Sequence, residues 1–168
     1  MPKILVTENF TVVGHEKPHQ SRDNGGHVVI TPKKRYAHRY EMPLPLGTAL
    51  MHLSMIVGEA TTNVMKKNGL EVVRINYQDN GNWAYKPIYN KPPHLHVHLY
   101  VRTKGESHPD GDKRFQAFPD ALVFAPPESD YYKNFKPLTE EDCQDIKKEF
   151  ERLLATGKYQ DVSFKYSS

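Results

Sequence analysis

The sequence predicts an α+β fold: a mostly antiparallel sheet of about five strands packed with one long helix, followed by a C-terminal helix. Three observations carry this prediction. Residues 94–101 alternate between ring-bearing and aliphatic side chains, residues from about 48 to 67 repeat apolar side chains at helical spacing, and short β-branched segments flank that helix. The order of strands, helix, strands and helix is typical of the α+β class.

The segment 94–101 is the most informative part of the chain. Side chains on a strand alternate between its two faces. One face therefore carries three imidazoles and a phenol, and the other is aliphatic: His94, His96, His98 and Tyr100 against Leu95, Val97, Leu99 and Val101. We expect the aliphatic face to join the core. The opposite face presents groups that can attack, accept or donate protons near neutral pH.

The remaining elements follow from local patterns. Further strands are predicted at residues 3–7, 10–14, 27–31 and 70–77, and the last of these is expected to pair antiparallel with the histidine strand. The long helix, about 48–67, has its apolar stripe at Leu50, Leu53, Val57, Ala60 and Val64. The C-terminal helix, about 140–156, begins after the N-cap residue Thr139. Residues 103–137 show little periodicity.

Composition limits the class of protein. The chain has 168 residues, 38% hydrophobic and 26% charged, which suits one domain spanning 1–168 with no membrane-spanning segment. The N-terminus does not read as a signal peptide, and a lone cysteine, Cys143, forms no internal disulfide and is expected to be packing. These features favour a cytoplasmic protein. The net charge of +3 comes from scattered residues, so no nucleic-acid partner is expected.

Two segments resemble blocks of the histidine triad family. Residues 94–100 (HLHVHLY) are similar to its signature, in which three histidines alternate with apolar residues. Residues 26–33 (GHVVITPK) resemble an upstream block of the same family, GHVLVIPK. The intervening elements have the expected lengths, so the resemblance covers a core of about residues 3–102. It implies the histidine triad fold and a homodimer that binds a nucleotide substrate.

The resemblance also implies a nucleotide hydrolase or nucleotidyl transferase. Such enzymes act on the α-phosphate of a nucleotide conjugate, for example a dinucleoside polyphosphate or a nucleoside phosphoramidate. By position His96 matches the nucleophile. A neutral imidazole can attack phosphorus and leave again, so a covalent nucleotidyl-histidine intermediate is chemically reasonable. His94 and His98 flank it and could orient it or bind phosphate oxygens. No resident metal or cofactor is implied, although Mg²⁺ could accompany the substrate phosphates.

Other predicted substrate-binding residues come from positions that match the family's motifs. They are Asn76, Asp79 and Gly81 beside the phosphates, Asn90 and Lys91 before the triad, and His15 near the ribose. The segment before the triad departs from the family, because Asn90 and Lys91 stand where a glutamine and a hydroxyl residue are common. The loop ahead of them is also longer. Trp83 and Tyr85 on this loop could stack on a base or anchor the loop.

Two other functions stay open at this level. Three imidazoles at alternate positions could instead bind a catalytic zinc ion, although no carboxylate is evident beside them. The altered segment before the triad could also leave a nucleotide-binding protein without turnover. For the homodimer, the long helix offers the apolar residues Met51, Met55, Ile56 and Met65 as a contact face.

Overall fold

The computed structural model describes residues 2–79, 81–84, 86–104 and 130–166. Within these ranges it contains two α-helices and five strands: β1 (Lys3–Val6), β2 (Phe10–Gly14), β3 (His27–Pro32), α1 (Leu44–Lys67), β4 (Val72–Gln78), β5 (Val97–Thr103) and α3 (Glu140–Leu154). The strands form an antiparallel sheet in the order β1-β2-β3-β5-β4. The predicted fold class is confirmed, as is the antiparallel pairing of β4 with β5.

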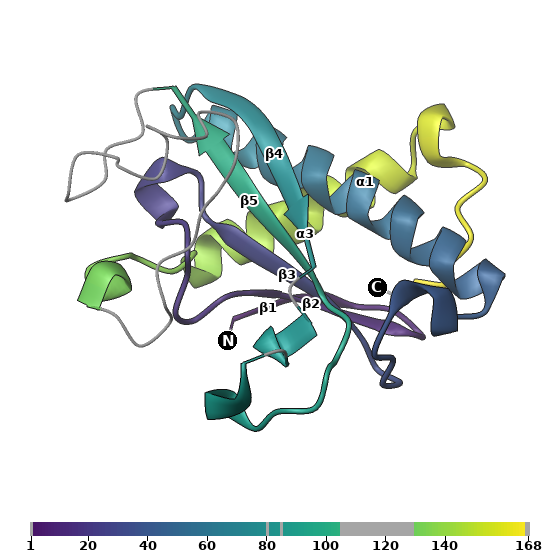
Figure 1. The fold of residues 1–168 in the computed structure, drawn as a ribbon. Coiled ribbons are helices and arrows are strands. Elements are labelled where there is room, and N and C mark those ends of the chain that lie inside the picture. The colour runs from purple at the N-terminus through teal and green to yellow at the C-terminus, as the bar shows by residue number, and fades with distance from the viewer. Residues whose placement is uncertain (1, 80, 85, 105–129, 167–168) are drawn as a thin grey trace.

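Both helices cover the same face of the sheet (Figure 1). Helix α3 contacts β1, whereas α1 contacts β4 and β5, and the two helices also pack against each other. The predicted alternation along the histidine segment places Leu95, Leu99 and Val101 in this layer, each with no exposed surface. His98 and Tyr100 point to the other face of the sheet. Burial of the aliphatic row thereby fixes the direction of the imidazoles.

The long helix begins four residues earlier than the predicted start at about residue 48. Pro43 is its N-cap and Pro45 lies in its first turn. Proline is compatible with the first turn because the backbone N–H groups there have no intrahelical partner. The two prolines therefore start the helix rather than keep the chain irregular. Among the described residues, no helix has both the length and the apolar character needed to cross a membrane.

The histidine strand begins later than predicted, at Val97 instead of residue 94, and extends to Thr103. Its ladder with β3 starts at the pair Ile30–Val97. The last two residues of β3, Thr31 and Pro32, are not paired with the histidine segment, and proline has no N–H to donate to a ladder. The backbone N–H of Leu95 donates instead to the carbonyl of Tyr36, at 2.7 Å.

The C-terminal helix begins after Thr139 as predicted and ends at Leu154, two residues before the predicted end. The Thr139 hydroxyl accepts from the N–H of Asp142 at 3.0 Å, and the Asp142 carboxylate accepts from the N–H of Thr139 at 2.9 Å. This reciprocal cap satisfies two N–H groups of the first turn. Cys143 is buried beside Gly14, and burial raises the pKa of its thiol to about 11.

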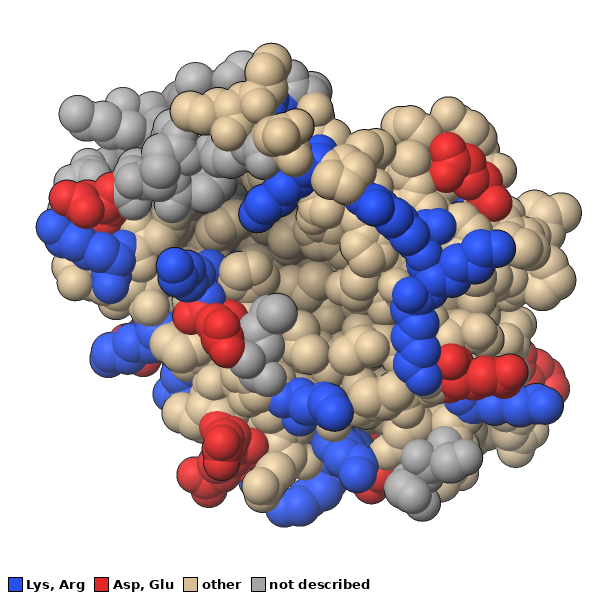
Figure 2. Space-filling view, turned by 90° about the horizontal axis from the view of Figure 1, so that it is seen from below, with Lys and Arg blue, Asp and Glu red and all other residues tan. Residues whose placement is uncertain are grey.

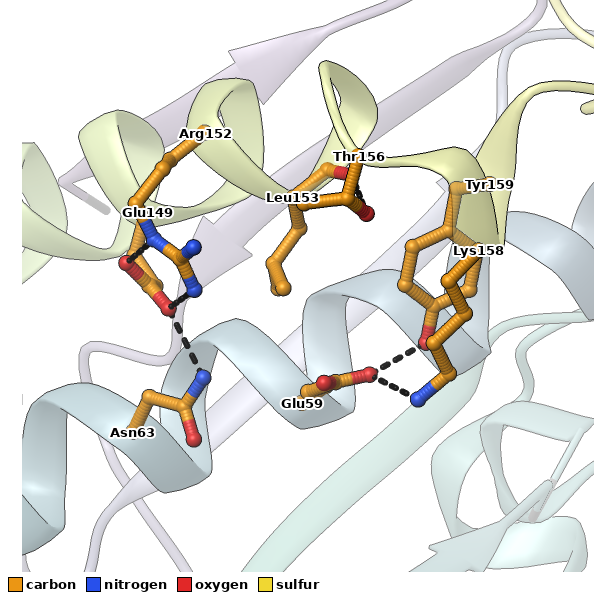
Figure 3. Close-up of polar contacts among 8 residues, drawn as sticks. All are labelled: Glu59, Asn63, Glu149, Arg152, Leu153, Thr156, Lys158 and Tyr159. Carbon is orange, nitrogen blue, oxygen red and sulfur yellow. Dashed lines mark hydrogen bonds and ion pairs between the residues drawn. The ribbon is translucent and has the colours of Figure 1, made fainter.

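Polar contacts join α1 to α3 and to the short turn at Gly157–Tyr159 that follows α3 (Figure 3). Glu59 on α1 accepts from the Lys158 ammonium at 2.6 Å and from the Tyr159 hydroxyl. One turn further along, Asn63 donates to Glu149 on α3 at 2.7 Å. Exposed pairs of this kind contribute ~1 kcal/mol or less each. The helix pair therefore depends mainly on the apolar residues beneath these contacts.

Replacing Phe150 tests this dependence. Its side chain is fully buried and its ring lies 5.2 Å from the ring of Tyr166, edge to face. Phe150→Ala should lower the free energy of unfolding by ~3–5 kcal/mol, because it removes buried contacts and leaves a cavity. Chemical denaturation measures this change. The control is Tyr40→Ala, at a ring that is 83% exposed, which should change stability by less than ~0.5 kcal/mol. Equal effects of the two variants would contradict the assignment of the core.

Candidate active site

Two histidines of the triad lie together at the start of β5. The ring centroids of His96 and His98 are 4.5 Å apart and the rings are nearly perpendicular. His96 stands on the extended segment before the strand, half-buried, and His98 is the second residue of the strand, 5% exposed. Both side chains line the same cavity. His94 is not among the described residues that line it, and the Nε2 atom of its ring is buried with no partner among the described residues.

The hydrogen bonds of His96 fix its tautomer. Its Nδ1 lies 2.8 Å from the backbone carbonyl oxygen of His94. A carbonyl oxygen only accepts, so Nδ1 must carry the hydrogen. In the neutral ring, Nε2 then keeps its lone pair. A neutral His96 thus presents its unprotonated nitrogen at Nε2, and this is the form of the ring that can act as a nucleophile.

His98 is held by a second buried imidazole. His27 Nε2 lies 2.8 Å from His98 Nδ1, and the backbone N–H of His19 donates to His27 Nδ1 at 3.2 Å. Because His27 Nδ1 accepts, a neutral His27 carries its hydrogen on Nε2 and donates it to His98 Nδ1. A neutral His98 must then carry its own hydrogen on Nε2. The result is a nucleophilic nitrogen on His96 beside a hydrogen-bond donor on His98.

The surroundings of His27 and His98 keep both rings neutral. The pKa values of His27 and His98 lie well below the ordinary 6.5, first because burial disfavours the charged ring and second because the neighbouring imidazoles repel a further proton. Burial also lowers the pKa of His19 to about 4 and the pKa of His15 by a smaller amount. The tautomers assigned to His27 and His98 therefore persist at neutral pH.

The cavity over these rings has a volume of about 590 Å³, within the range of about 300–1,000 Å³ typical of small-molecule sites. Loop 82–91 and segment 132–135 supply its walls. Lys17, Lys91 and Lys133 line it, against one acidic side chain, Glu16, among the described residues. The face that bears loop 82–91 is hollowed, with Lys and Arg side chains around the hollow (Figure 2). Such a site suits an anionic ligand.

The structure brings some of the predicted binding residues to the cavity. His15 and Lys91 line it. The His15 ring lies parallel to the His27 ring at 4.6 Å, and its Nδ1 accepts from the N–H of Lys17 at 3.1 Å. A neutral His15 therefore carries its hydrogen on Nε2 and offers a donor.

Four other predicted binding residues are not among the described lining residues. Asn76 on β4 pairs with Tyr100 on β5, and the oxygen of its side-chain amide is buried without a partner among the described residues. Asp79 closes a turn by accepting from the N–H of Gly81 at 3.1 Å. Asn90 ends a short 3₁₀ turn with φ of 40°, and its side chain is exposed. Tyr85, considered for base stacking, lies outside the described residues.

Sequence reasoning missed several residues of the site. His27 lies in the upstream block, but nothing in that block indicates a contact with His98. His19 was not among the predicted site residues, and its backbone N–H fixes the tautomer of His27. The cavity also includes Tyr132, Lys133 and Phe135 from a region without periodicity. No sequence signal pointed to these three, because their place depends on tertiary contacts.

Within residues 2–79, 81–84, 86–104 and 130–166, no group of three His, Cys, Asp or Glu side chains is placed to hold a metal ion. His96 and His98 each use Nδ1 for a hydrogen bond, so any ligand that they share would have to meet their Nε2 atoms.

Comparison with known proteins gives matches in structure only. No protein-family model and no curated protein sequence matches the chain. Among solved structures, the chain is similar to a hypothetical histidine triad nucleotide-binding protein from Sulfolobus tokodaii, with a TM-score of 0.56 and 17% identity over 91% of this chain and 85% of the other. A zinc-bound histidine triad protein from Mycobacterium smegmatis matches with a TM-score of 0.55 and 19% identity, over 90% and 84%. A histidine triad protein from Marinobacter aquaeolei matches with a TM-score of 0.53 and 19% identity, over 90% and 87%.

Each comparison covers most of both chains, and all three neighbours carry the same family name. The chain therefore has the fold of the histidine triad proteins.

Proposed function

We propose that this chain belongs to the histidine triad family and is a nucleotide hydrolase or nucleotidyl transferase that works through a covalent intermediate on His96. The observation that carries the proposal is the pair of tautomers: an unprotonated Nε2 on His96 next to an N–H donor on His98. The fold shared with histidine triad proteins supports it, and so does a cavity lined by lysines.

The proposed reaction has two displacements. His96 Nε2 attacks the α-phosphorus of a nucleotide conjugate, and the bond from phosphorus to the leaving group breaks as the P–N bond forms. His98 Nε2–H donates to a phosphate oxygen that gains charge in the transition state. Water or another acceptor then attacks phosphorus, the P–N bond breaks, and His96 returns to its neutral form. Lys91 at the cavity wall neutralises charge on a phosphorylated leaving group.

A nucleophile and a mere ligand-binding residue respond differently to substitution. His96→Ala should lower turnover of a nucleoside phosphoramidate by several orders of magnitude, while nucleotide affinity changes by about tenfold or less, because binding depends on other contacts. Rapid-quench single-turnover assays with a labelled nucleotide should trap label on the wild type but not on the variant. His38→Ala, at an exposed histidine outside the cavity, is the control.

Three outcomes separate the alternatives. Full activity of His96→Ala would refute the proposed mechanism. Nucleotide binding by the wild type without turnover would identify a non-catalytic nucleotide-binding protein. Loss of activity with a chelator, on a phosphoramidate substrate that carries no metal-binding polyphosphate, would favour zinc chemistry, as the zinc-bound structural neighbour suggests for comparison.

The neutral imidazoles also generate a prediction for stability. Between about pH 6.5 and about pH 5 the unfolded chain binds protons that His19, His27 and His98 do not bind when folded, because their folded pKa values are lowered. The free energy of unfolding should therefore decrease as the pH falls through this interval. Carboxylates such as Asp142 titrate at lower pH, so they do not obscure the effect. Denaturation midpoints that stay constant between about pH 7 and about pH 5 would contradict the assignment of neutral rings.

We also propose that the chain is a homodimer formed along strand β4. This strand lies at an edge of the sheet, where backbone groups are available to a second strand. Beside it, Met51, Met55 and Tyr77 are about half exposed and line an apolar cavity of about 380 Å³. Two residues that the sequence suggested for this face, Ile56 and Met65, are fully buried and belong to the core instead.

Light scattering at micromolar protein should give the mass of a dimer. Met55→Glu should shift the mass toward that of a monomer, because a charge at a buried apolar contact is costly. The control is Lys66→Glu at the exposed end of the same helix, which should leave the mass unchanged. A monomeric wild type would refute this assembly.

A further inference from the structure

The segment between Asp130 and Leu138 forms a wall of the cavity. In sequence it lies more than a hundred positions after the loop that carries His15 and His19. The N–H of Arg22 donates to the carbonyl of Lys136 at 2.8 Å, and the N–H of Lys136 donates to the Ser21 hydroxyl at 3.1 Å. An ion pair of 2.8 Å joins the Lys136 ammonium to Asp23. These contacts tie the segment to the loop that carries His15 and His19.

A buried carboxylate anchors the same two parts to the helices. The Arg22 guanidinium binds Asp142 through two hydrogen bonds of 3.0 Å each. Asp142 is 3% exposed, caps α3 and accepts from the Asn68 amide at the end of α1 at 3.1 Å. Bidentate charge-assisted contacts of this type fix geometry as well as adding stability. The wall is therefore held in place before any ligand binds.

The wall continues the row of imidazoles as a row of aromatic rings. The His19 ring lies 6.3 Å from the His98 ring on one side and 4.8 Å from the Tyr132 ring on the other. Tyr132 meets Phe135 edge to face at 5.4 Å. Tyr132 is 9% exposed, whereas Phe135 is only half-buried and lines the cavity with it. The site thus changes from proton-active rings near His96 to apolar rings at its far side.

This order matches the chemistry of a nucleotide. The phosphate must lie at His96 and His98, where the nucleophile and the donor are. The sugar would follow along His15 and His19. The base, a flat apolar ring system, would then reach Tyr132 and Phe135. Aromatic side chains bind bases by stacking without strong sequence preference, because every base has a π-face.

We propose that Tyr132 and Phe135 form the base-binding part of the site, so that residues outside the core resembling the histidine triad family determine how the nucleoside is recognised. The inference rests on the proposed function only in taking a nucleotide as the ligand. Trp83 also lines the cavity, and the Lys86 ammonium lies 4.5 Å from the centroid of its ring.

The test compares two probes that differ only by the base: adenosine 5′-monophosphate and ribose 5-phosphate. Calorimetry should show that the wild type binds the nucleotide more tightly. Phe135→Ala should weaken binding of the nucleotide by about tenfold, as expected for loss of one base–aromatic stack, and leave ribose 5-phosphate unchanged. Phe135→Tyr keeps the ring and should retain the preference. Tyr40→Ala, at an exposed ring outside the cavity, is the control, and circular dichroism verifies the fold of every variant.

Several results would overturn the inference. Equal affinity of the wild type for both probes would remove the base-binding site. Unchanged nucleotide affinity in Phe135→Ala, or an equal loss for both probes, would show that Phe135 does not contact the base. Loss of the preference in Trp83→Ala but not in Phe135→Ala would place the base at Trp83 instead. If the preference depends on Phe135 but no label is trapped on His96, the inference stands and the proposed covalent mechanism fails.

Discussion

The hydrogen bond between His27 and His98 is the contact on which the site depends. It joins two neighbouring strands, and it is buried, so neither ring can exchange its partner for water at low cost. Its direction follows from the backbone N–H of His19, which occupies the other nitrogen of His27. A main-chain donor in a loop thus decides where the hydrogen on His98 lies. A protonated His98 would carry a hydrogen on Nδ1 as well and could no longer accept from His27.

The two faces of β5 place different demands on the same residues. On one side, Leu99 and Val101 must fill the core beneath the helices, and on the other His98 must meet His27 at hydrogen-bond distance. A shift of the strand by one residue would exchange the two faces and lose both sets of contacts. The core and the site therefore enforce the same register.

Much of the fold could be predicted because its signals are local. The alternation of residues 94–101 determined which side chains enter the core, and Thr139 with the acidic turn after it marked the start of α3. Two boundaries differed: Pro45 is accepted in the first turn of α1, and the ladder between β3 and β5 stops at the pair Ile30–Val97. These effects depend on which neighbour the backbone meets, which no single segment reveals.

The candidate site was less accessible to sequence reasoning. Spacing and resemblance pointed to His15, His96 and His98, which line the cavity, and to His94, which is not among its described lining residues. The place of Tyr132 and Phe135 depends on contacts between Ser21 and Lys136 that link distant parts of the chain. Likewise, Asp79 and Gly81 have the residue types of a binding loop, and in the structure their contact closes a turn. Residue type alone does not distinguish these two uses of a polar side chain.

The position of Trp83 has a practical consequence. It is the chain's one tryptophan, and it stands in the wall of the cavity with Lys86 against its ring and a left-handed backbone, φ of 57°. Intrinsic emission excited selectively at the indole therefore originates from the cavity rather than from the core. The molecule carries its own optical reporter of occupancy, and a change in that signal can be followed in real time without labels. The same property makes this fluorescence a weak measure of global unfolding, for which the buried tyrosines in circular dichroism are better suited.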